Sequence, residues 1–282
     1  MLSENSMYML EFKDIWLADV HAWELEKGKS CIVMGHGFGA VKDLLMTYAE
    51  KFGKFYSLIL FDYRHFGRSR GEPRQLISIR KQLEDWRRVV EYAKGKYEKV
   101  AIWGSSFSGG HVLEIASECD VDAVISQVPF VDGVEVARAM GRRGVKFTVL
   151  GLLDLLLSPI GGWKVPIAGK GGLLPSDYLK LIEEYRRRYS AEIPWENYTY
   201  ARISLSIPFY RPVKRADRIK CPVLYLIAEK DTVTPPGAAM KAAERTKEAE
   251  VMKVNCGHFD VYLEFFEETS NRELEFLKKY LC

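Results

Sequence analysis

Val100-Ala-Ile-Trp-Gly-Ser-Ser-Phe-Ser-Gly-Gly110 runs from a short apolar stretch, through small residues, into the apolar helical pattern of 112–116. This order predicts a strand, a tight turn and a helix. A serine at the apex of such a turn is typical of a nucleophile elbow, where a strained backbone exposes the hydroxyl. The stretch therefore predicts both a strand-to-helix unit and a candidate nucleophile.

Ser106 is the serine that best fits the apex of this turn. An elbow needs small residues two positions before and two after the nucleophile, and Ser106 has Gly104 and Ser108 there. Ser105 would instead be flanked by Trp103 and Phe107. Ser108 replaces the second glycine of the G-x-S-x-G pattern but keeps its small size. The alternative is a Ser/Gly-rich helix cap without a chemical role.

The chain around this unit predicts the α/β class. Short apolar runs alternate with segments of helical period, which favours βαβ units and a mainly parallel sheet. A helix is expected at 75–94, where apolar residues recur every three or four positions, and an antiparallel hairpin at 7–12 and 16–23. Strands are expected at 31–34, 57–62, 100–104, 123–128, 223–228 and 251–255.

The rhythm breaks between residues 132 and 218, where Gly and Pro cluster and strand-like runs are missing. We interpret this segment as a helical cap inserted into a core formed by 1–131 and 219–282. The apolar stretch 145–160 is shorter than the roughly 20 residues of a membrane span and contains Lys146 and Asp154, so a cap helix is expected. Leu153 and Leu156 are predicted to line a substrate pocket. Alternatively, such leucines pack the cap on the core or join two copies in a homodimer.

A serine hydroxyl is a poor nucleophile at neutral pH unless a histidine base and an orienting acid accompany it. His258 follows the run at 251–255, and Asp231 follows the run at 223–228. Parallel strands bring the loops after them to one sheet edge, beside the elbow. Asp132, and less favourably Glu229, are the alternative acids.

Acyl chemistry also needs donors for a developing oxyanion. The turn Gly35-His-Gly-Phe-Gly39 follows the run at 31–34, so the backbone N–H groups of Phe38 and Phe107 are the candidates. A rival interpretation is a dinucleotide site, because Gly35-x-Gly37-x-x-Ala40 fits G-x-G-x-x-G/A and Asp62 ends the next run. That interpretation explains neither the elbow nor the acid and the histidine.

Five segments together resemble the α/β-hydrolase family: HGFG, DYRHFGRS, GSSFSGG, AEKD and CGHFD. The strings RHFGRSRGEPRQ and QVPFVDG resemble a subgroup with bacterial hydrolases and fungal polyketide acyltransferases. The resemblance implies an eight-stranded, mostly parallel sheet, a cap after the sixth strand and a Ser106-Asp231-His258 triad. It also implies an oxyanion hole at Phe38 and Phe107.

We therefore expect a serine hydrolase that cleaves a small-molecule carboxylic ester of short to medium acyl chain, without metal or organic cofactor. An acyltransferase or thioesterase using the same triad is the alternative, and a dinucleotide-binding oxidoreductase a distant one. The net charge of +3, with acids and bases interleaved, gives no indication of nucleic-acid binding. Five cysteines and no visible signal peptide favour the cytoplasm. Scarce Gln and Asn suggest a thermophilic source.

Overall fold

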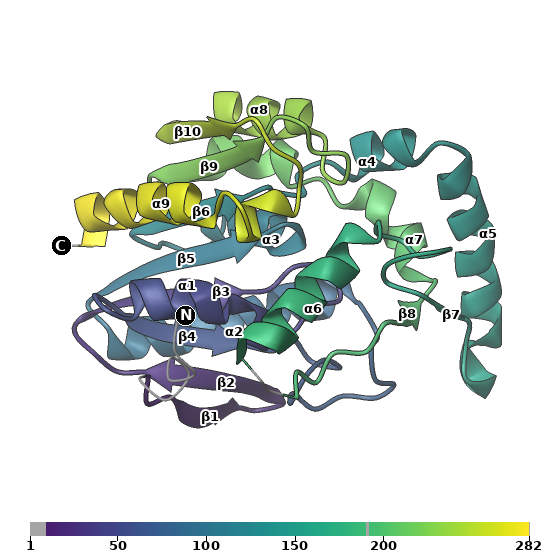
Figure 1. Ribbon diagram of the computed structural model, residues 1–282, viewed down its shortest axis with the longest axis horizontal. Helices are drawn as coiled ribbons and strands as arrows, with labels where there is room; N and C mark the ends of the chain where they lie inside the picture. Colours follow the sequence, from purple (N-terminus) through teal and green to yellow (C-terminus); the bar gives the residue numbers. More distant parts are fainter. Residues whose placement is uncertain (1–9, 190–191, 282) are drawn as a thin grey trace.

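An eight-stranded sheet lies at the centre of the computed structural model, which describes residues 10–189 and 192–281 (Figure 1). The strand order is β1-β2-β4-β3-β5-β6-β9-β10. β2 pairs antiparallel with both neighbours, and all other pairs are parallel. The strands are β1 Lys13–Leu17, β2 Val20–Leu25, β3 Ser30–Gly35, β4 Ser57–Phe61, β5 Lys99–Ser105, β6 Ala123–Gln127, β9 Val223–Ala228 and β10 Ala249–Val254. The predicted α/β fold with a mainly parallel sheet is confirmed.

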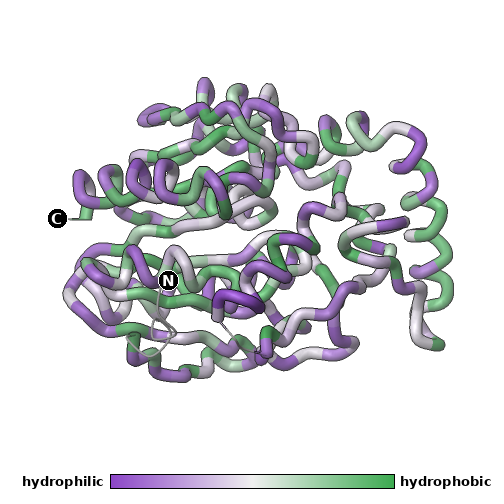
Figure 2. Tube along the Cα trace, viewed as in Figure 1, coloured by the Kyte–Doolittle hydropathy of each residue, from purple (hydrophilic) through white to green (hydrophobic). Residues whose placement is uncertain are grey.

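Helices cover both faces of this sheet, because successive side chains of a strand point to opposite sides. In β3, Cys31 and Val33 pack in one core cluster with residues of α2, α3 and α8, while Ile32 and Met34 pack in another with α1 and α9. Figure 2 shows the matching alternation of hydrophobic and hydrophilic segments along α9. These helices are α1 Met46–Phe52, α2 Ile79–Lys96, α3 Phe107–Ala116, α8 Pro236–Arg245 and α9 Phe266–Leu281.

Two predicted boundaries were wrong. The hairpin turns at Ala18, which has a positive φ of 56°, so its strands are 13–17 and 20–25 and not 7–12 and 16–23. Residues 7–9 lie outside the described part. The helix predicted at 75–94 begins at Ile79, because Gln75 has a φ of 65° and bonds to the His65 carbonyl instead. A left-handed non-glycine residue leaves no pattern in the sequence.

The segment between β6 and β9 supplies most elements outside the sheet layers. It contains α4 Gly133–Met140, α5 Arg142–Leu157, α6 Asp177–Tyr189 and α7 Ile203–Ser206. It also contains a two-stranded pair, β7 Lys164–Val165 and β8 Thr199–Tyr200. The pair was not predicted, since two residues are too few to show a strand period. Figure 1 places α5 at the edge of the molecule farthest from the central sheet.

A buried ion pair anchors α5. Asp154 is fully buried and accepts hydrogen bonds from the Trp163 N–H at 2.6 Å and from the Arg202 backbone and guanidinium at 2.7–2.9 Å. Burial alone would raise the pKa of Asp154, but these bonds lower it below its ordinary value. The charged residue that interrupts the apolar stretch thus fixes the helix. Within the described ranges, no helix is long and apolar enough to cross a bilayer.

Glu273 is a buried carboxyl of α9, and it makes the stability of the fold depend on pH. Burial raises its pKa from 4.5 to about 8, although Trp103 beside it acts in the opposite direction. The folded state therefore keeps a proton that the unfolded chain loses above pH 4.5. Wild-type stability consequently falls as pH rises between these two values.

We expect Glu273→Gln to leave the free energy of unfolding nearly unchanged near pH 4.5 and to raise it increasingly toward pH 8. The gain over the wild type approaches about 1.4 kcal/mol per pH unit. Urea titrations at several pH values measure it. Glu275→Gln, on the exposed side of the same helix, is the control and should show no such trend. A difference independent of pH would contradict the prediction.

Candidate active site

Ser106 occupies the turn between β5 and α3 in a strained conformation. Its φ of 58° and ψ of −115° lie in a region that a residue with a side chain rarely adopts. Two backbone hydrogen bonds to the end of β6 and the turn after it hold Ser106 there. The Ser106 N–H donates to the Gln127 carbonyl at 2.8 Å, and the Phe130 N–H donates to the Ser106 carbonyl at 2.9 Å. The side chain is thereby presented at the carboxyl edge of the sheet.

The turn also explains the small residue at position 104. A Cβ on Gly104 would lie 2.2 Å from the carbonyl oxygen of Ser108, so any side chain there would force the helix away. Ser108 itself is fully buried, and its side chain points to hydrogen-bond partners outside the turn. Its replacement of the usual glycine therefore leaves the turn intact.

His258 and Asp231 lie beside Ser106. The Ser106 Oγ is 2.9 Å from Nε2 of His258, and Nδ1 of His258 is 2.6 Å from Oδ2 of Asp231. The two residues come from the loops that follow β10 and β9, whose parallel strands end at the same sheet edge. The three side chains thus form one continuous line of hydrogen bonds.

The surroundings of Asp231 keep its carboxylate charged. Burial would raise its pKa, but the charge of His258 and hydrogen bonds from His258 and Thr234 outweigh burial and lower the pKa. The backbone N–H groups of Val233 and Thr234 donate to Oδ1 at 2.7 and 2.8 Å. A charged, fixed acceptor therefore faces Nδ1 of His258.

The alternative acids do not reach His258. The Asp132 carboxylate accepts hydrogen bonds from Nε and Nη2 of Arg211, both at 2.8 Å. It also accepts one from the Val134 N–H, so Asp132 is the N-cap residue of α4. Glu229 is exposed. His111, in α3, is fully buried and hydrogen-bonds to Tyr210 and Gln82.

The loop after β3 brings Phe38 close to the elbow. A Cβ on Gly37 would lie 3.2 Å from the Cβ of Ser106. The Gly37 carbonyl lies 3.1 Å from Nδ1 of His36, and a trans peptide points its N–H opposite to its C=O, so the Phe38 N–H faces away from His36. Phe107 is the first residue of α3, and its N–H has no acceptor within that helix.

The geometry does not support the dinucleotide alternative. Asp62, its expected ribose ligand, is fully buried. Its carboxylate accepts from the backbone and the ammonium of Lys42 at 2.8 and 2.5 Å and from the Arg68 N–H at 3.0 Å. Since these bonds occupy both oxygens inside the protein, Asp62 is a structural anchor for the loop that carries Phe38.

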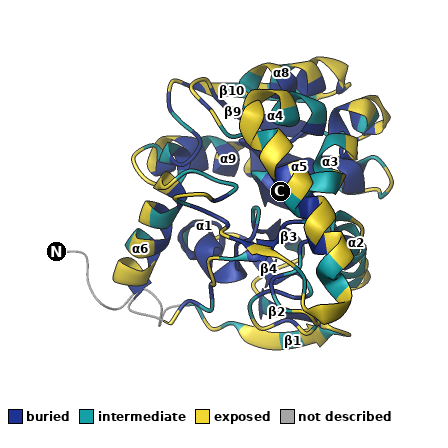
Figure 3. Cartoon of the chain, turned by 90° about the vertical axis from the view of Figure 1, so that its right-hand side faces the viewer, coloured by how far each residue is buried: buried dark blue, intermediate teal, exposed yellow. Residues whose placement is uncertain are grey.

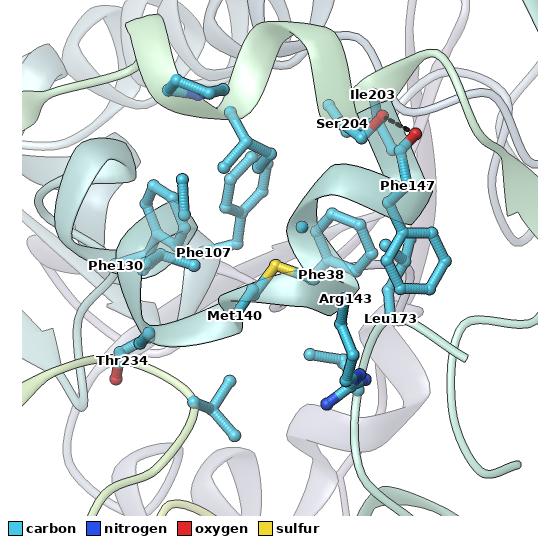
Figure 4. A pocket seen from close by; sticks show the side chains of 18 of the residues that line it. Phe38, Phe107, Phe130, Met140, Arg143, Phe147, Leu173, Ile203, Ser204 and Thr234 are labelled. Atoms are coloured by element: carbon cyan, nitrogen blue, oxygen red, sulfur yellow. Dashed lines mark hydrogen bonds between the residues drawn. The ribbon is translucent and has the colours of Figure 1, made fainter. Parts of the chain in front are cut away.

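An apolar cavity of about 350 Å³ opens beside Ser106 (Figure 4). Its walls come from several parts of the chain that are distant in sequence. They are the loop at Phe38, the elbow, the turn after β6, α4, the start of α5, residues 173–175, α7 with the turn after it, and the loop at 232–234. The lining residues include Phe38, Phe107, Phe130, Met140, Phe147 and Ile203. Apart from Phe38 and Phe107, these residues were not predicted from the sequence, because no single segment shows that these parts of the chain converge.

The prediction that Leu153 and Leu156 line this cavity was wrong. They are 39% and 75% exposed, whereas the cavity is lined by Arg143, Phe147 and other residues of the first turns of α5. Figure 3 shows exposed residues along α5. The helix is apolar on most of its circumference, so its sequence does not reveal which side faces the cavity.

Metal-ligating side chains do not gather in the described part of the chain, which contains no cluster of three or more His, Cys, Asp or Glu suited to a metal ion. The site thus consists of a hydroxyl, an imidazole, a carboxylate and backbone N–H groups. Such groups are suited to nucleophilic acyl chemistry.

Comparisons with known proteins show which proteins this chain resembles. The quorum-quenching protein AidA of Acinetobacter baumannii is 37% identical over 267 residues, covering 88% of this chain and 86% of its own. The thiohydrolase aneE of Aspergillus aculeatus is 25% identical, covering 74% and 72%. The crystal structure of the α/β hydrolase GrgF from Penicillium superposes with a TM-score of 0.78 at 24% identity, covering 96% and 98%.

The family assignment rests on nearly the whole chain. Residues 14–271 match the sequence model of the alpha/beta hydrolase family. This span includes nearly the whole sheet, the elbow and the loops that carry Asp231 and His258. The strand order and the solved relative show the same architecture. The chain belongs to the alpha/beta hydrolase family.

Proposed function

We propose that this protein is a serine hydrolase that cleaves carboxylic esters through an acyl-enzyme. The observation that carries the proposal is the line of hydrogen bonds from Ser106 through His258 to Asp231. Ser106 lies in a strained turn and lines an apolar cavity. A fluorophosphonate probe tests it. Intact-mass labelling and peptide mapping should place one adduct on Ser106, and labelling elsewhere would contradict the proposal.

In this mechanism, Oγ of Ser106 attacks the ester carbonyl carbon while its proton passes to Nε2 of His258. The carbonyl oxygen becomes an oxyanion, which the N–H groups of Phe38 and Phe107 stabilise. The bond to the alcohol then breaks as His258 returns the proton to the leaving oxygen. Water then attacks the acyl carbon while its proton passes to His258. The bond to Oγ breaks as His258 returns that proton to Ser106, which releases the acid. Asp231 orients His258 and stabilises its charged form.

We further propose that residues 132–218 form a cap on a core made of 1–131 and 219–282. Support comes from α4, the start of α5 and α7, which supply much of the cavity wall next to Ser106. The cavity volume of about 350 Å³ lies at the lower end of the roughly 300–1,000 Å³ of ligand pockets. A short to medium acyl chain is therefore the substrate that fits best.

We expect the specificity constant for p-nitrophenyl esters to rise from acetate to an acyl chain of about four to eight carbons and then to fall. Each buried CH₂ contributes about 0.8 kcal/mol until the cavity is full. Met140→Ala, which enlarges the cavity, should shift the optimum to longer chains. Leu156→Ala, outside it, should leave the optimum in place. A profile that is flat, or unchanged by Met140→Ala, would contradict the prediction.

Acyl transfer and thioester cleavage are the second candidate. Two relatives favour it: the thiohydrolase aneE, and the polyketide transferase grgF of Penicillium, which is 27% identical over 268 residues. The same triad serves both reactions, because only the leaving group or the acceptor differs. Product analysis distinguishes them: an acyl thioester that is cleaved faster than the matching oxygen ester indicates a thioesterase, and acylated acceptor alcohol indicates a transferase.

We also propose that the exposed face of α5 joins two copies in a homodimer. Leu152, Leu155 and Leu156 of α5 and Ile160 in the turn after it are 55–82% exposed, an apolar patch that a soluble monomer rarely shows. Light scattering should give a dimer mass for the wild type and a monomer mass for Leu156→Glu. Phe55→Glu, at an exposed aromatic residue elsewhere, should remain dimeric. A monomeric wild type would contradict this proposal.

A further inference from the structure

Ser108, the residue that departs from the G-x-S-x-G pattern, belongs to a buried chain of hydrogen bonds. Its Oγ donates to the carbonyl of His36 and is also bonded to the hydroxyl of Tyr63. The indole Nε1 of Trp86 lies 2.6 Å from the same Tyr63 oxygen. All four residues are at most 1% exposed, so no solvent replaces any of these partners.

The direction of every bond in this chain is determined by chemistry. An indole N–H only donates and a carbonyl only accepts. Ser108 therefore gives its single proton to the His36 carbonyl, and Tyr63 must give its own proton to Ser108. Trp86 then donates to the Tyr63 oxygen. Each hydroxyl has both a donor and an acceptor, which is the condition for a buried polar network to be favourable.

The chain of bonds joins the two segments that carry the candidate oxyanion donors. Ser108 lies in the first turn of α3, directly after Phe107, and His36 lies two residues before Phe38. The next carbonyl along the loop, that of Gly37, is held by the His36 ring. Burial lowers the pKa of His36 to about 4, so near pH 7 the ring is neutral, with one nitrogen protonated. Of these two consecutive peptides, the first is thus bonded directly to α3, and the second is held by a side chain of the same loop.

We propose that Ser108 is a positioning residue that sets the spacing between the N–H groups of Phe38 and Phe107. This inference rests on the proposed function. A glycine at 108 would leave the His36 carbonyl and the Tyr63 hydroxyl without this buried partner. Gly35 leaves the space that the Ser108 hydroxyl and the Trp86 ring occupy. A Cβ at position 35 would lie 3.2 Å from Oγ of Ser108 and 2.3 Å from the Trp86 ring.

The test is Ser108→Ala, measured by kcat and KM on a p-nitrophenyl ester and by the rate of fluorophosphonate labelling. Removing an oxyanion donor outright costs about 10²–10³ in kcat, and a displaced donor costs less, so we expect a loss of about tenfold. The labelling rate should fall in parallel, because the phosphonyl oxygen uses the same donors. KM should stay within twofold, since the cavity is not altered.

Ser126→Ala is the matched control. Ser126 is equally buried, and its hydroxyl donates at 2.7 Å to the Gly109 carbonyl of the same helix, but it does not touch the loop. Both variants should lose similar thermal stability, and Ser126→Ala should keep kcat within twofold. Tyr63→Phe, which leaves Ser108 bonded to His36, should lower kcat two- to threefold and should add no further loss to Ser108→Ala.

The outcomes separate the two proposals. If the wild type is labelled on Ser106 and Ser108→Ala behaves like Ser126→Ala, the positioning role is overturned while the proposed function stands. If the wild type is not labelled on Ser106, both proposals are overturned. If Ser108→Ala does not fold, Tyr63→Phe decides: a loss of kcat at constant KM supports the role, and wild-type kcat overturns it.

Discussion

Ser106→Ala is expected to abolish ester hydrolysis and fluorophosphonate labelling while the protein stays folded. Loss of the nucleophile alone lowers turnover by about 10⁶ in a well-studied serine protease. The same scale is expected here, because Oγ of Ser106, at 2.9 Å, is the hydroxyl that bonds to Nε2 of His258 among the described residues. Alanine has a Cβ like serine and fits the same strained backbone, so the melting temperature should change little. Turnover of a p-nitrophenyl ester and circular dichroism measure both effects.

Ser105→Ala is the control for this variant. Ser105 is the neighbouring serine, but its hydroxyl bonds to the hydroxyl of Tyr262 and, at 2.9 Å, to Nε2 of Gln127, and it does not contact His258. We expect it to retain substantial activity and full labelling. Wild-type turnover in Ser106→Ala, or an adduct mapped to Ser105 or Ser108, would show that the elbow has been assigned to the wrong serine.

The parts of the site that the sequence predicts are those encoded by short segments. The elbow needs a strand, small residues at 104 and 108 and a helix, all within one stretch. Asp231 and His258 each follow an apolar run, and parallel pairing brings the ends of those runs to one edge. These placements depend on local pattern and on sheet geometry alone, so no distant contact had to be known.

The cavity could not be predicted in this way. Phe38, Phe130, Met140 and Ile203 are widely separated in the chain and meet only after the segment between β6 and β9 has folded back over the sheet edge. The apolar residues of α5 gave no direction either, because they occupy most of its circumference. In the structure Leu156 is exposed, whereas Phe147 of the same helix is buried, and the sequence does not distinguish the two. Position along a helix shows which face is used only when the helix is amphipathic.

Ser108 has one role that its sequence pattern indicates and a second that only the structure reveals. The pattern treats position 108 as a place where bulk is forbidden, and serine satisfies it by being small. The structure shows that its hydroxyl also has partners, the His36 carbonyl and the Tyr63 hydroxyl, on segments distant in the chain. A hydrogen bond between such segments leaves no trace in the spacing of residues.

Asp231→Asn is expected to lower turnover by about 10⁴, the effect of the equivalent change in a chymotrypsin-type enzyme. The amide that replaces the carboxylate can present an N–H to Nδ1 of His258, which favours the tautomer with its proton on Nε2, where the base must be free. Asp231→Asn also removes the negative charge that stabilises the His258 imidazolium. Because two backbone N–H groups donate to Oδ1, the amide oxygen takes that side and its nitrogen faces His258.

Asp132→Asn provides the comparison that makes this prediction decisive. Asp132 also follows a strand of the parallel sheet and was the leading alternative acid, but its oxygens are engaged by Arg211 and by the N–H of Val134. The amide in Asp132→Asn should weaken the ion pair with Arg211 and the N-cap hydrogen bond of α4, which lowers the melting temperature. Turnover should stay within a few-fold of the wild type. Steady-state kinetics and thermal melts on both variants give the ranking. If Asp132→Asn lost turnover by orders of magnitude and Asp231→Asn did not, the orienting acid would have to come from the loop after β6, and the hydrogen bond between Asp231 and His258 would have only a structural role.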